Sequence, residues 1–177
     1  IHDNVIKFWG IYPEYIRQAF TYTFTAGIND PNKRIIENEW QKLFTRLRAE
    51  IVSCQCGRTT FLSAFENLGD TTYRCQRCGT QFPTLSFSNV DYRIPIYQNA
   101  RLYACITETA CDDFSRITGE VIENRLKKGM LGIRNMSDKV WDVKMPDGNF
   151  YHIDYEKGFP IWEDLEIKFG DITAKIK

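Results

Sequence analysis

Four cysteines near the middle of the chain constrain its fold more than any other feature. They form two pairs, Cys54-Gln55-Cys56-Gly57 and Cys75-Gln76-Arg77-Cys78-Gly79. In extended backbone, residues i and i+2 point to the same side, so the first pair can share one ion, and a Cys-x-x-Cys turn brings the second pair around the other half of a tetrahedron. The spacing predicts a zinc ribbon over residues 53–84, with one structural Zn²⁺ bound by Cys54, Cys56, Cys75 and Cys78.

The residues around each pair repeat the same pattern. A glycine follows each pair, and because glycine reaches positive φ without strain, the backbone can point amide N–H groups at the thiolates. A short run with threonine then ends at Phe61 and at Phe82, and three arginines are placed to offset the thiolate charge: Arg58, Arg74 and Arg77. Two alternatives remain open. A disulfide pair needs an oxidising compartment, and a redox Cys-x-x-Cys needs a helix after its first cysteine, where this sequence predicts a strand.

Length and composition exclude several classes of protein. The chain has 177 residues, 43% of them hydrophobic and 14% aromatic, which favours one or two folded domains over disorder. Lys plus Arg equals Asp plus Glu at 23 each, so there is no overall attraction to nucleic acid or to a membrane surface. No apolar run is long enough to span a bilayer, and residues 1–10 lack a signal-peptide pattern, so we expect a cytoplasmic location. The first residues read like the continuation of a longer chain.

Residues 1–52 predict a helical segment with two amphipathic helices. The first covers about 13–26 and ends at Gly27, with Ile16, Phe20 and Phe24 on one stripe. The second covers about 36–51, with a stripe that includes Trp40, Phe44 and Leu47. Two helices cannot bury both stripes alone. We therefore expect exposed apolar surface that another molecule covers, or that leads to self-association.

Beyond the cysteines the pattern changes to the period of two that is typical of strands. After an expected linker at 82–89, short strands are predicted over 101–107, 118–124, 131–135, 139–145, 149–155, 165–169 and 171–176. Pro146-Asp147-Gly148 is a clear hairpin turn. Many short strands with almost no helix predict an antiparallel β-sandwich over 85–177. The fold class is thus α+β in three parts: helical hairpin, zinc ribbon and sandwich.

Other candidate residues carry weaker signals. Cys105 and Cys111 could be further ligands or a disulfide, but Cys105 lies in an apparent strand, which favours a buried free thiol. Four basic residues form a local cluster that is either a solvated loop or a partner-binding site: Arg125, Lys127, Lys128 and Arg134. Nucleic-acid binding would need a basic and aromatic surface stripe, so we expect none.

The run from Gly27 to Ile35, Gly-Ile-Asn-Asp-Pro-Asn-Lys-Arg-Ile, resembles the end of a serine/threonine protein kinase C-lobe. The resemblance implies that Arg34 forms a buried ion pair with the glutamate of an Ala-Pro-Glu motif. That motif does not occur in this sequence. The Gly-rich loop, the His-Arg-Asp catalytic loop and the Asp-Phe-Gly motif are also missing from it, so we expect this chain to be non-catalytic.

The sandwich region resembles the forkhead-associated fold, which reads phosphothreonine. The resemblance covers residues 131–137, the turn at 146–148 and residues 165–170. The Gly-Arg pair and the Ser-x-x-His of that family have no counterpart in this sequence, which puts phosphopeptide recognition in doubt.

Together the three parts resemble the C-terminal half of bacterial kinases of tellurite-resistance-associated systems. That resemblance implies a regulatory module whose protein partner is a von Willebrand A-type protein, a PP2C-type phosphatase or the missing kinase half. The alternatives are a working fragment of a protein kinase and a nucleic-acid-binding ribbon protein.

Overall fold

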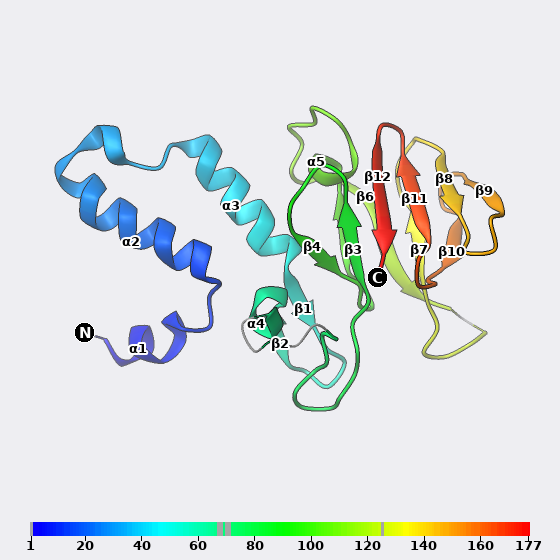
Figure 1. The fold of residues 1–177 in the computed structure, drawn as a ribbon, viewed down its shortest axis with the longest axis horizontal. Coiled ribbons are helices and arrows are strands. Elements are labelled where there is room, and N and C mark those ends of the chain that lie inside the picture. Colours follow the sequence, from blue (N-terminus) through cyan, green and yellow to red (C-terminus); the bar gives the residue numbers. More distant parts are fainter. Residues whose placement is uncertain (1, 67–68, 70–71, 125) are drawn as a thin grey trace.

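The computed structural model describes residues 2–66, 69, 72–124 and 126–177. The chain passes from an N-terminal group of helices, through the cysteine segment, into two antiparallel β-sheets (Figure 1). This arrangement confirms the α+β class that the sequence predicts. No helix in the described ranges is long and apolar enough to cross a lipid bilayer.

The N-terminal helices follow one another in a short series. They are α1 (Asp3–Trp9), α2 (Glu14–Asn29), the 3-10 helix η1 (Pro31–Lys33) and α3 (Glu37–Ala49). The expected helix end at Gly27 is wrong, because α2 continues to Asn29. Gly27 has a packing role instead: a Cβ placed there would lie 3.0 Å from Cγ of Arg34, whose Nε donates to the Gly27 carbonyl at 2.7 Å.

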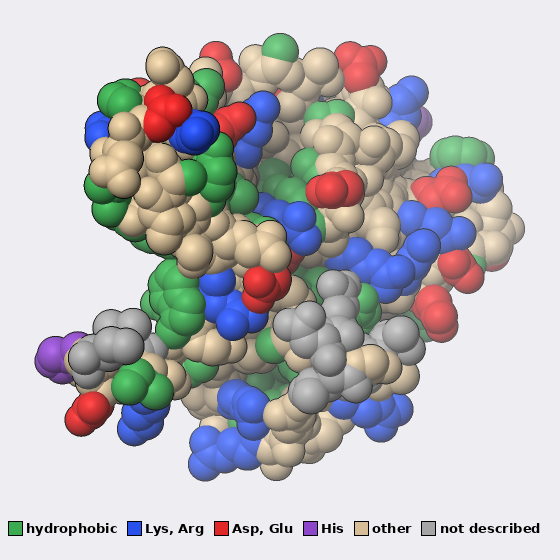
Figure 2. Space-filling model, turned by 60° about the vertical axis from the view of Figure 1, so that its left-hand side comes forward, with side chains coloured by type: hydrophobic (Ala, Val, Ile, Leu, Met, Phe, Trp, Pro, Cys, Tyr) green, Lys and Arg blue, Asp and Glu red, His purple; other side chains and the backbone are tan. Residues whose placement is uncertain are grey.

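Aromatic rings hold α2 and α3 together around Phe20. Its ring centroid lies 4.9 Å from that of Trp40 and 6.3 Å from that of Phe44. The predicted stripes are only partly covered, since Ile16 is buried while Phe24 is 60% exposed and Phe44 is 46% exposed. Apolar side chains are visible on the surface of this helical part in Figure 2. The helices therefore present a large apolar face to solvent.

The ribbon contains more helix than the sequence predicts. It begins with the hairpin of β1 (Ile51–Ser53) and β2 (Thr59–Phe61), followed by α4 (Leu62–Glu66). The strand expected after the second cysteine pair is a single antiparallel bridge between Arg74 and Gln81. Helix α4 places Leu62 and Phe65 in the ribbon's own small core, which explains why the chain leaves the extended conformation there.

Two antiparallel sheets follow the ribbon. The six-stranded sheet has the order β4-β3-β12-β11-β8-β9. Its strands are β3 (Thr84–Phe87), β4 (Arg93–Pro95), β8 (Trp141–Lys144), β9 (Phe150–Ile153), β11 (Glu166–Phe169) and β12 (Ile172–Ile176). The four-stranded sheet has the order β10-β7-β6-β5. Its strands are β5 (Arg101–Tyr103), β6 (Ile117–Glu123), β7 (Leu131–Asn135) and β10 (Gly158–Pro160).

A continuous apolar core fills the space between these sheets. Val121 and Ile133 reach it from the four-stranded sheet, and Leu85, Trp141 and Phe169 reach it from the six-stranded sheet. The rings of Trp141 and Phe169 meet edge to face with centroids 4.7 Å apart. Two sheets around one core make the sandwich that the period-two pattern predicts.

Several sequence predictions for this region need correction. The linker expected at 82–89 is wrong, because residues 84–87 form β3 and pair with β12. The strand expected at 101–107 ends at Tyr103, and Cys105 lies in the short helix α5 (Ala104–Thr107) and is half-buried. The turn at 146–148 is confirmed, since β8 and β9 pair antiparallel with Trp141 opposite Ile153.

Candidate metal centre

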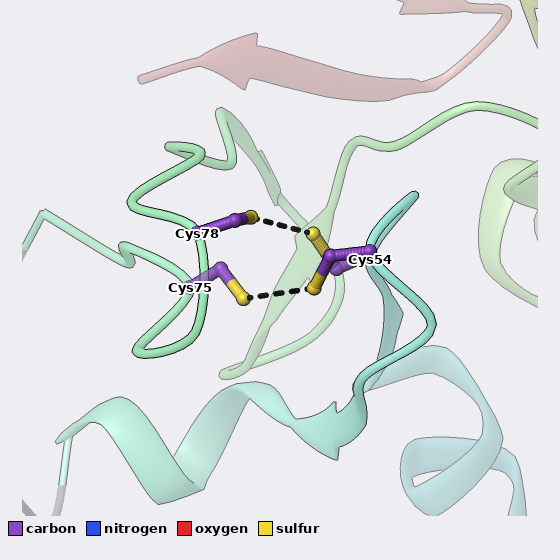
Figure 3. Close-up of side chains that lie close together, drawn as sticks. Cys54, Cys75 and Cys78 are labelled. Carbon is purple, nitrogen blue, oxygen red and sulfur yellow. Dashed lines mark hydrogen bonds between the residues drawn. The ribbon is translucent and has the colours of Figure 1, made fainter.

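The four cysteines of the two predicted pairs converge on one point. Their sulfur atoms all lie within 4.8 Å of one another. Cys54 Sγ is 3.4 Å from Cys78 Sγ, and Cys56 Sγ is 3.7 Å from Cys75 Sγ. Figure 3 shows Cys75 and Cys78 pointing from one loop toward Cys54 on the other. Each of these contacts joins a cysteine of the first pair to a cysteine of the second, as expected if all four bind one ion.

The distances fit a tetrahedral ion. With metal–sulfur bonds of about 2.3 Å, the sulfur atoms of a tetrahedron lie about 3.8 Å apart. The two sulfur atoms of a disulfide are bonded at about 2.05 Å, much closer than the sulfur atoms of this cluster. All six cysteines of the chain are free thiols. Residues 75–79 form a turn, not the start of a helix, so the helix that activates a redox Cys-x-x-Cys is missing there. The cluster could hold a metal ion such as zinc.

Two similar backbone turns position the thiols. Gly57 N–H donates to the Cys54 carbonyl at 2.9 Å, and Gly79 N–H donates to the Cys75 carbonyl at 2.7 Å. Both glycines have positive φ, 84° and 75°. Glycine adopts this conformation without steric cost, so the positive φ that the sequence predicts at both positions is confirmed.

The surroundings of the thiols shift their pKa values in different directions. The Thr80 hydroxyl lowers the pKa of Cys78 to about 6, and the Arg77 backbone N–H lowers the pKa of Cys75. Burial raises the pKa of Cys54 to about 12. Because a metal ion displaces thiol protons on binding, occupancy of this site should depend on pH.

Two of the three predicted arginines join the two loops, while Arg74 donates to the Gln81 side chain within its own segment at 3.5 Å. Arg58 Nη2 donates to the Gln76 side chain at 2.9 Å, and Arg77 Nη1 donates to the Cys56 carbonyl at 3.1 Å. These bonds hold the cysteine pairs at their mutual distance.

The ribbon has little apolar core of its own. Its buried residues are Val52, Cys54, Leu62, Phe65, Tyr73, Cys75 and Phe82. Two of the seven are metal-ligand candidates, so a large part of this core depends on the thiols. A segment of this size rarely folds without a metal or other support, because it buries too little surface.

The residues of the predicted basic cluster lie in different surroundings. Arg134 lies on β7 opposite Glu120 and forms an ion pair with it at 2.6 Å. Lys127 and Lys128 are exposed in the loop between β6 and β7. Arg125 lies outside the described residues. Arg34 bonds the Gly27 carbonyl, and no carboxylate within the described ranges lies within ion-pair distance of its side chain.

Two carboxylates that no sequence motif singles out, those of Glu50 and Glu108, form ion pairs in the structure. Glu50 is buried and accepts from Arg46 Nε at 2.7 Å, a pair whose i, i+4 spacing on the second predicted helix was the available signal. Glu108 accepts from Arg116 Nη1 at 2.8 Å and from Lys139 Nζ at 3.1 Å. Nothing in the spacing of these three residues points to their contact.

Comparison of the chain with protein-family models, with curated proteins and with solved structures gives no match.

Proposed function

We propose that this chain is a non-catalytic regulatory and interaction module. In this proposal a Zn²⁺ ion bound by the four clustered cysteines stabilises the ribbon, the ribbon couples the helices to the sandwich, and the sandwich docks a protein partner. When bound, the ion supplies only cross-linking of the two loops, since four thiolates leave no open coordination position for a substrate.

The observation that carries the proposal is that the ribbon contacts both of its neighbours. On the helical side, the rings of Tyr12 and Phe61 lie 6.0 Å apart, and Leu62 N–H donates to the Glu50 carbonyl at 2.8 Å. On the sandwich side, Arg93 Nη1 donates to the Tyr73 hydroxyl at 3.1 Å. A folded ribbon therefore contributes to holding the helices and the sandwich in their relative positions.

The resemblances add finer elements to the proposal. The sandwich is forkhead-associated-like: the residues that carry that resemblance lie largely on β7 and β11, one strand in each sheet. The helices are the end of a kinase C-lobe, and their exposed apolar face is where a further kinase segment would pack. The partner proposed on these grounds is a von Willebrand A-type protein, a PP2C-type phosphatase or the missing kinase half.

A metal-removal experiment tests the proposal. The purified chain should contain one zinc ion, and chelation should abolish hydrogen-exchange protection in β1, β2 and α4 while β11 and β12 stay protected. Cys78→Ser should reproduce the effect of chelation, and Cys111→Ser is the matched control because Cys111 lies outside the cluster. Unchanged protection after chelation would sink the proposal.

An ATP-binding and phosphorylation assay addresses the enzyme alternative. The proposal predicts no ATP binding and no phosphate transfer by this chain. Measurable transfer to a protein substrate would show a working kinase fragment instead.

A further inference from the structure

The edge of the six-stranded sheet at β9 is the second feature that invites a functional explanation. β9 ends the strand order of that sheet, and Figure 1 shows it at the outer end of the sandwich. It pairs with β8 in regular register, from Trp141 opposite Ile153 to Lys144 opposite Phe150. Among the described residues no strand pairs with its other side. That side is therefore open to an added strand.

Hydrogen-bond alternation identifies the backbone groups on the open side. At the turn between β8 and β9, Met145 N–H donates to the Asn149 carbonyl at 2.8 Å. Because opposite residues of an antiparallel pair are bonded and non-bonded in alternation, Tyr151 bonds β8, while Phe150 and His152 turn their N–H and C=O groups away from it. No backbone partner for these four groups lies within the described ranges. A further strand would supply the donors and acceptors that match them.

The other three edges of the two large sheets are protected against such pairing. β4 and β10 have only three residues each and end in Pro95 and Pro160, which have no N–H to donate. β5 has a register shift between Leu102 and Tyr103, and the Arg48 guanidinium lies 3.6 Å from the centre of the Tyr103 ring. β9 contains no proline, lysine or bulge, which are usual protections of an edge strand. It is thus the edge best suited to bind another strand.

The outer side chains of this edge are already ordered. The Lys144 ammonium lies 5.8 Å from the centre of the Phe150 ring, and His152 Nδ1 is 2.7 Å from Asp142 Oδ1. Yet Phe150 is 67% exposed. Covering a side chain that is already held in place favours binding, since it releases water at little cost in side-chain ordering.

The core face of β9 is incomplete at the edge. Ile153 is buried in the core, and Tyr151 lies on the same face because side chains two residues apart in a strand point to the same side. Its cross-strand neighbour Val143 is fully buried, whereas Tyr151 is 51% exposed. An apolar side chain from an added strand would cover this ring and extend the core.

The size of the edge favours an extended segment over a second copy of this chain. A symmetric pair of β9 strands would join four residues from each copy, whereas stable interfaces use about 20–30 residues a side. A flexible segment can continue past β9. Its outer side chains would then lie at one end of a hollow of about 630 Å³, whose lining runs from β3 to Phe150 and His152.

We propose that β9 binds an extended segment of a protein partner as an added β-strand, with backbone hydrogen bonds to Phe150 and His152 and an apolar side chain against Tyr151. In this mode main-chain hydrogen bonds supply affinity and alternate side chains supply specificity. The inference rests on the proposed function, because it assigns the surface by which the sandwich docks its partner.

Residue-resolved amide hydrogen exchange of the full chain, followed by NMR, tests the inference. The probe is an eight-residue peptide of alternating Val and Thr with a lysine at each end, and its matched control has proline in place of two valines. Without peptide, the amides of Phe150 and His152 should exchange fast and that of Tyr151 slowly, because only Tyr151 bonds β8. The Val-Thr peptide should slow exchange at Phe150 and His152 by about tenfold or more, and the proline peptide should not.

Variants of the edge give a second readout. Phe150→Pro removes an outward N–H and leaves the bonds to β8 in place, and Tyr151→Lys puts a charge where the apolar contact is expected. Each should weaken binding of the Val-Thr peptide by about tenfold or more. Trp162→Lys is the matched control, because Trp162 is 49% exposed but follows β10 of the other sheet, and it should change binding by less than about twofold. Retained protection in β11 and β12 shows that each variant is folded.

Three outcomes would overturn the inference: equal protection by both peptides or by neither, binding that survives both β9 variants, or protection of Phe150 and His152 without any peptide, which would mean that this chain or a second copy already covers the edge. Chelation is measured on the same sample. Zinc-dependent protection of β1, β2 and α4 without peptide binding at β9 refutes the edge site alone. A chain without zinc-dependent protection refutes the proposed function, whatever the peptide does.

Discussion

Arg46 donates from Nε to Glu50 Oε1 across 2.7 Å, at the point where the parts of the chain meet. Glu50 is 3% exposed and accepts from the Tyr15 hydroxyl at 3.4 Å, which joins α2 to the end of α3. The Arg46 guanidinium lies over the rings of Tyr15 at 4.3 Å and of Tyr92 at 5.3 Å, and Tyr92 belongs to the sandwich. One ion pair thus contacts helix and sandwich, while the Glu50 backbone bonds the ribbon.

Removal of the Glu50 carboxylate should destabilise the whole chain. Glu50→Ala leaves a largely covered Arg46 without its carboxylate, and breaking a buried pair costs about 3–5 kcal/mol. Because the Arg46 side chain is 31% exposed and solvent screens it in part, we expect a smaller cost than for a fully buried pair, about 2–3 kcal/mol. Urea unfolding measures the change. Glu14→Ala, which removes the exposed partner of Arg17, is the control and should cost at most about 1 kcal/mol. Equal effects would show that the junction contributes no more than a surface pair.

Stability should fall in acid partly through Glu108. The Arg116 guanidinium, with help from Lys139, lowers the pKa of Glu108 below its ordinary value of 4.5. A carboxyl whose pKa is lowered on folding stabilises the protein above that ordinary value, and this stability is lost as the pH falls through the lowered pKa. Glu108→Gln should therefore cost about 1–2 kcal/mol at pH 7 and progressively less below pH 4.5. Urea unfolding of both proteins across pH 3–7 measures the difference. A cost that is constant with pH would contradict this assignment.

Phosphothreonine peptides should bind no more tightly than their unphosphorylated forms. Arg116 and Lys139 line a pocket on the sandwich, but both already bond the Glu108 carboxylate. A phosphate would have to displace that carboxylate before either cation could bind it. Titration of the chain with a phosphothreonine peptide library measures this. A phosphate-dependent affinity that disappears in Lys127→Ala would show that the loop between β6 and β7 has taken over phosphate binding.

The helical part should self-associate through its uncovered apolar face. Phe24 and Ile28 are 60% and 59% exposed one turn apart on α2, and large uncovered patches are unusual on monomers. Sedimentation should show a larger species that grows with concentration, and Phe24→Ser with Ile28→Ser should remove it. Tyr151→Ser is the control, because Tyr151 is similarly exposed but lies on β9 of the sandwich. A strict monomer at all concentrations would contradict the prediction.

The cysteine cluster shows what a local pattern can predict. The geometry of Cys-x-Cys and Cys-x-x-Cys is set by two or three backbone units, so the thiol directions within each pair follow from the sequence alone. The sandwich was predictable for a similar reason, since the alternation in residues such as Trp141 and Val143 assigns them to one face. What the pattern missed were short elements such as β10 and α4, which depend on neighbours that are distant in the chain.

The sequence by itself determined the four thiol ligand candidates, the two main helices and the strand-rich C-terminal part, because each is encoded by spacing within a few residues. Only the tertiary structure decided how Glu108 meets Lys139, 31 residues away, and that β9 stands at the end of a sheet. Charge pairing and strand order arise from contacts between distant segments. Their strength depends on burial, which no local spacing specifies.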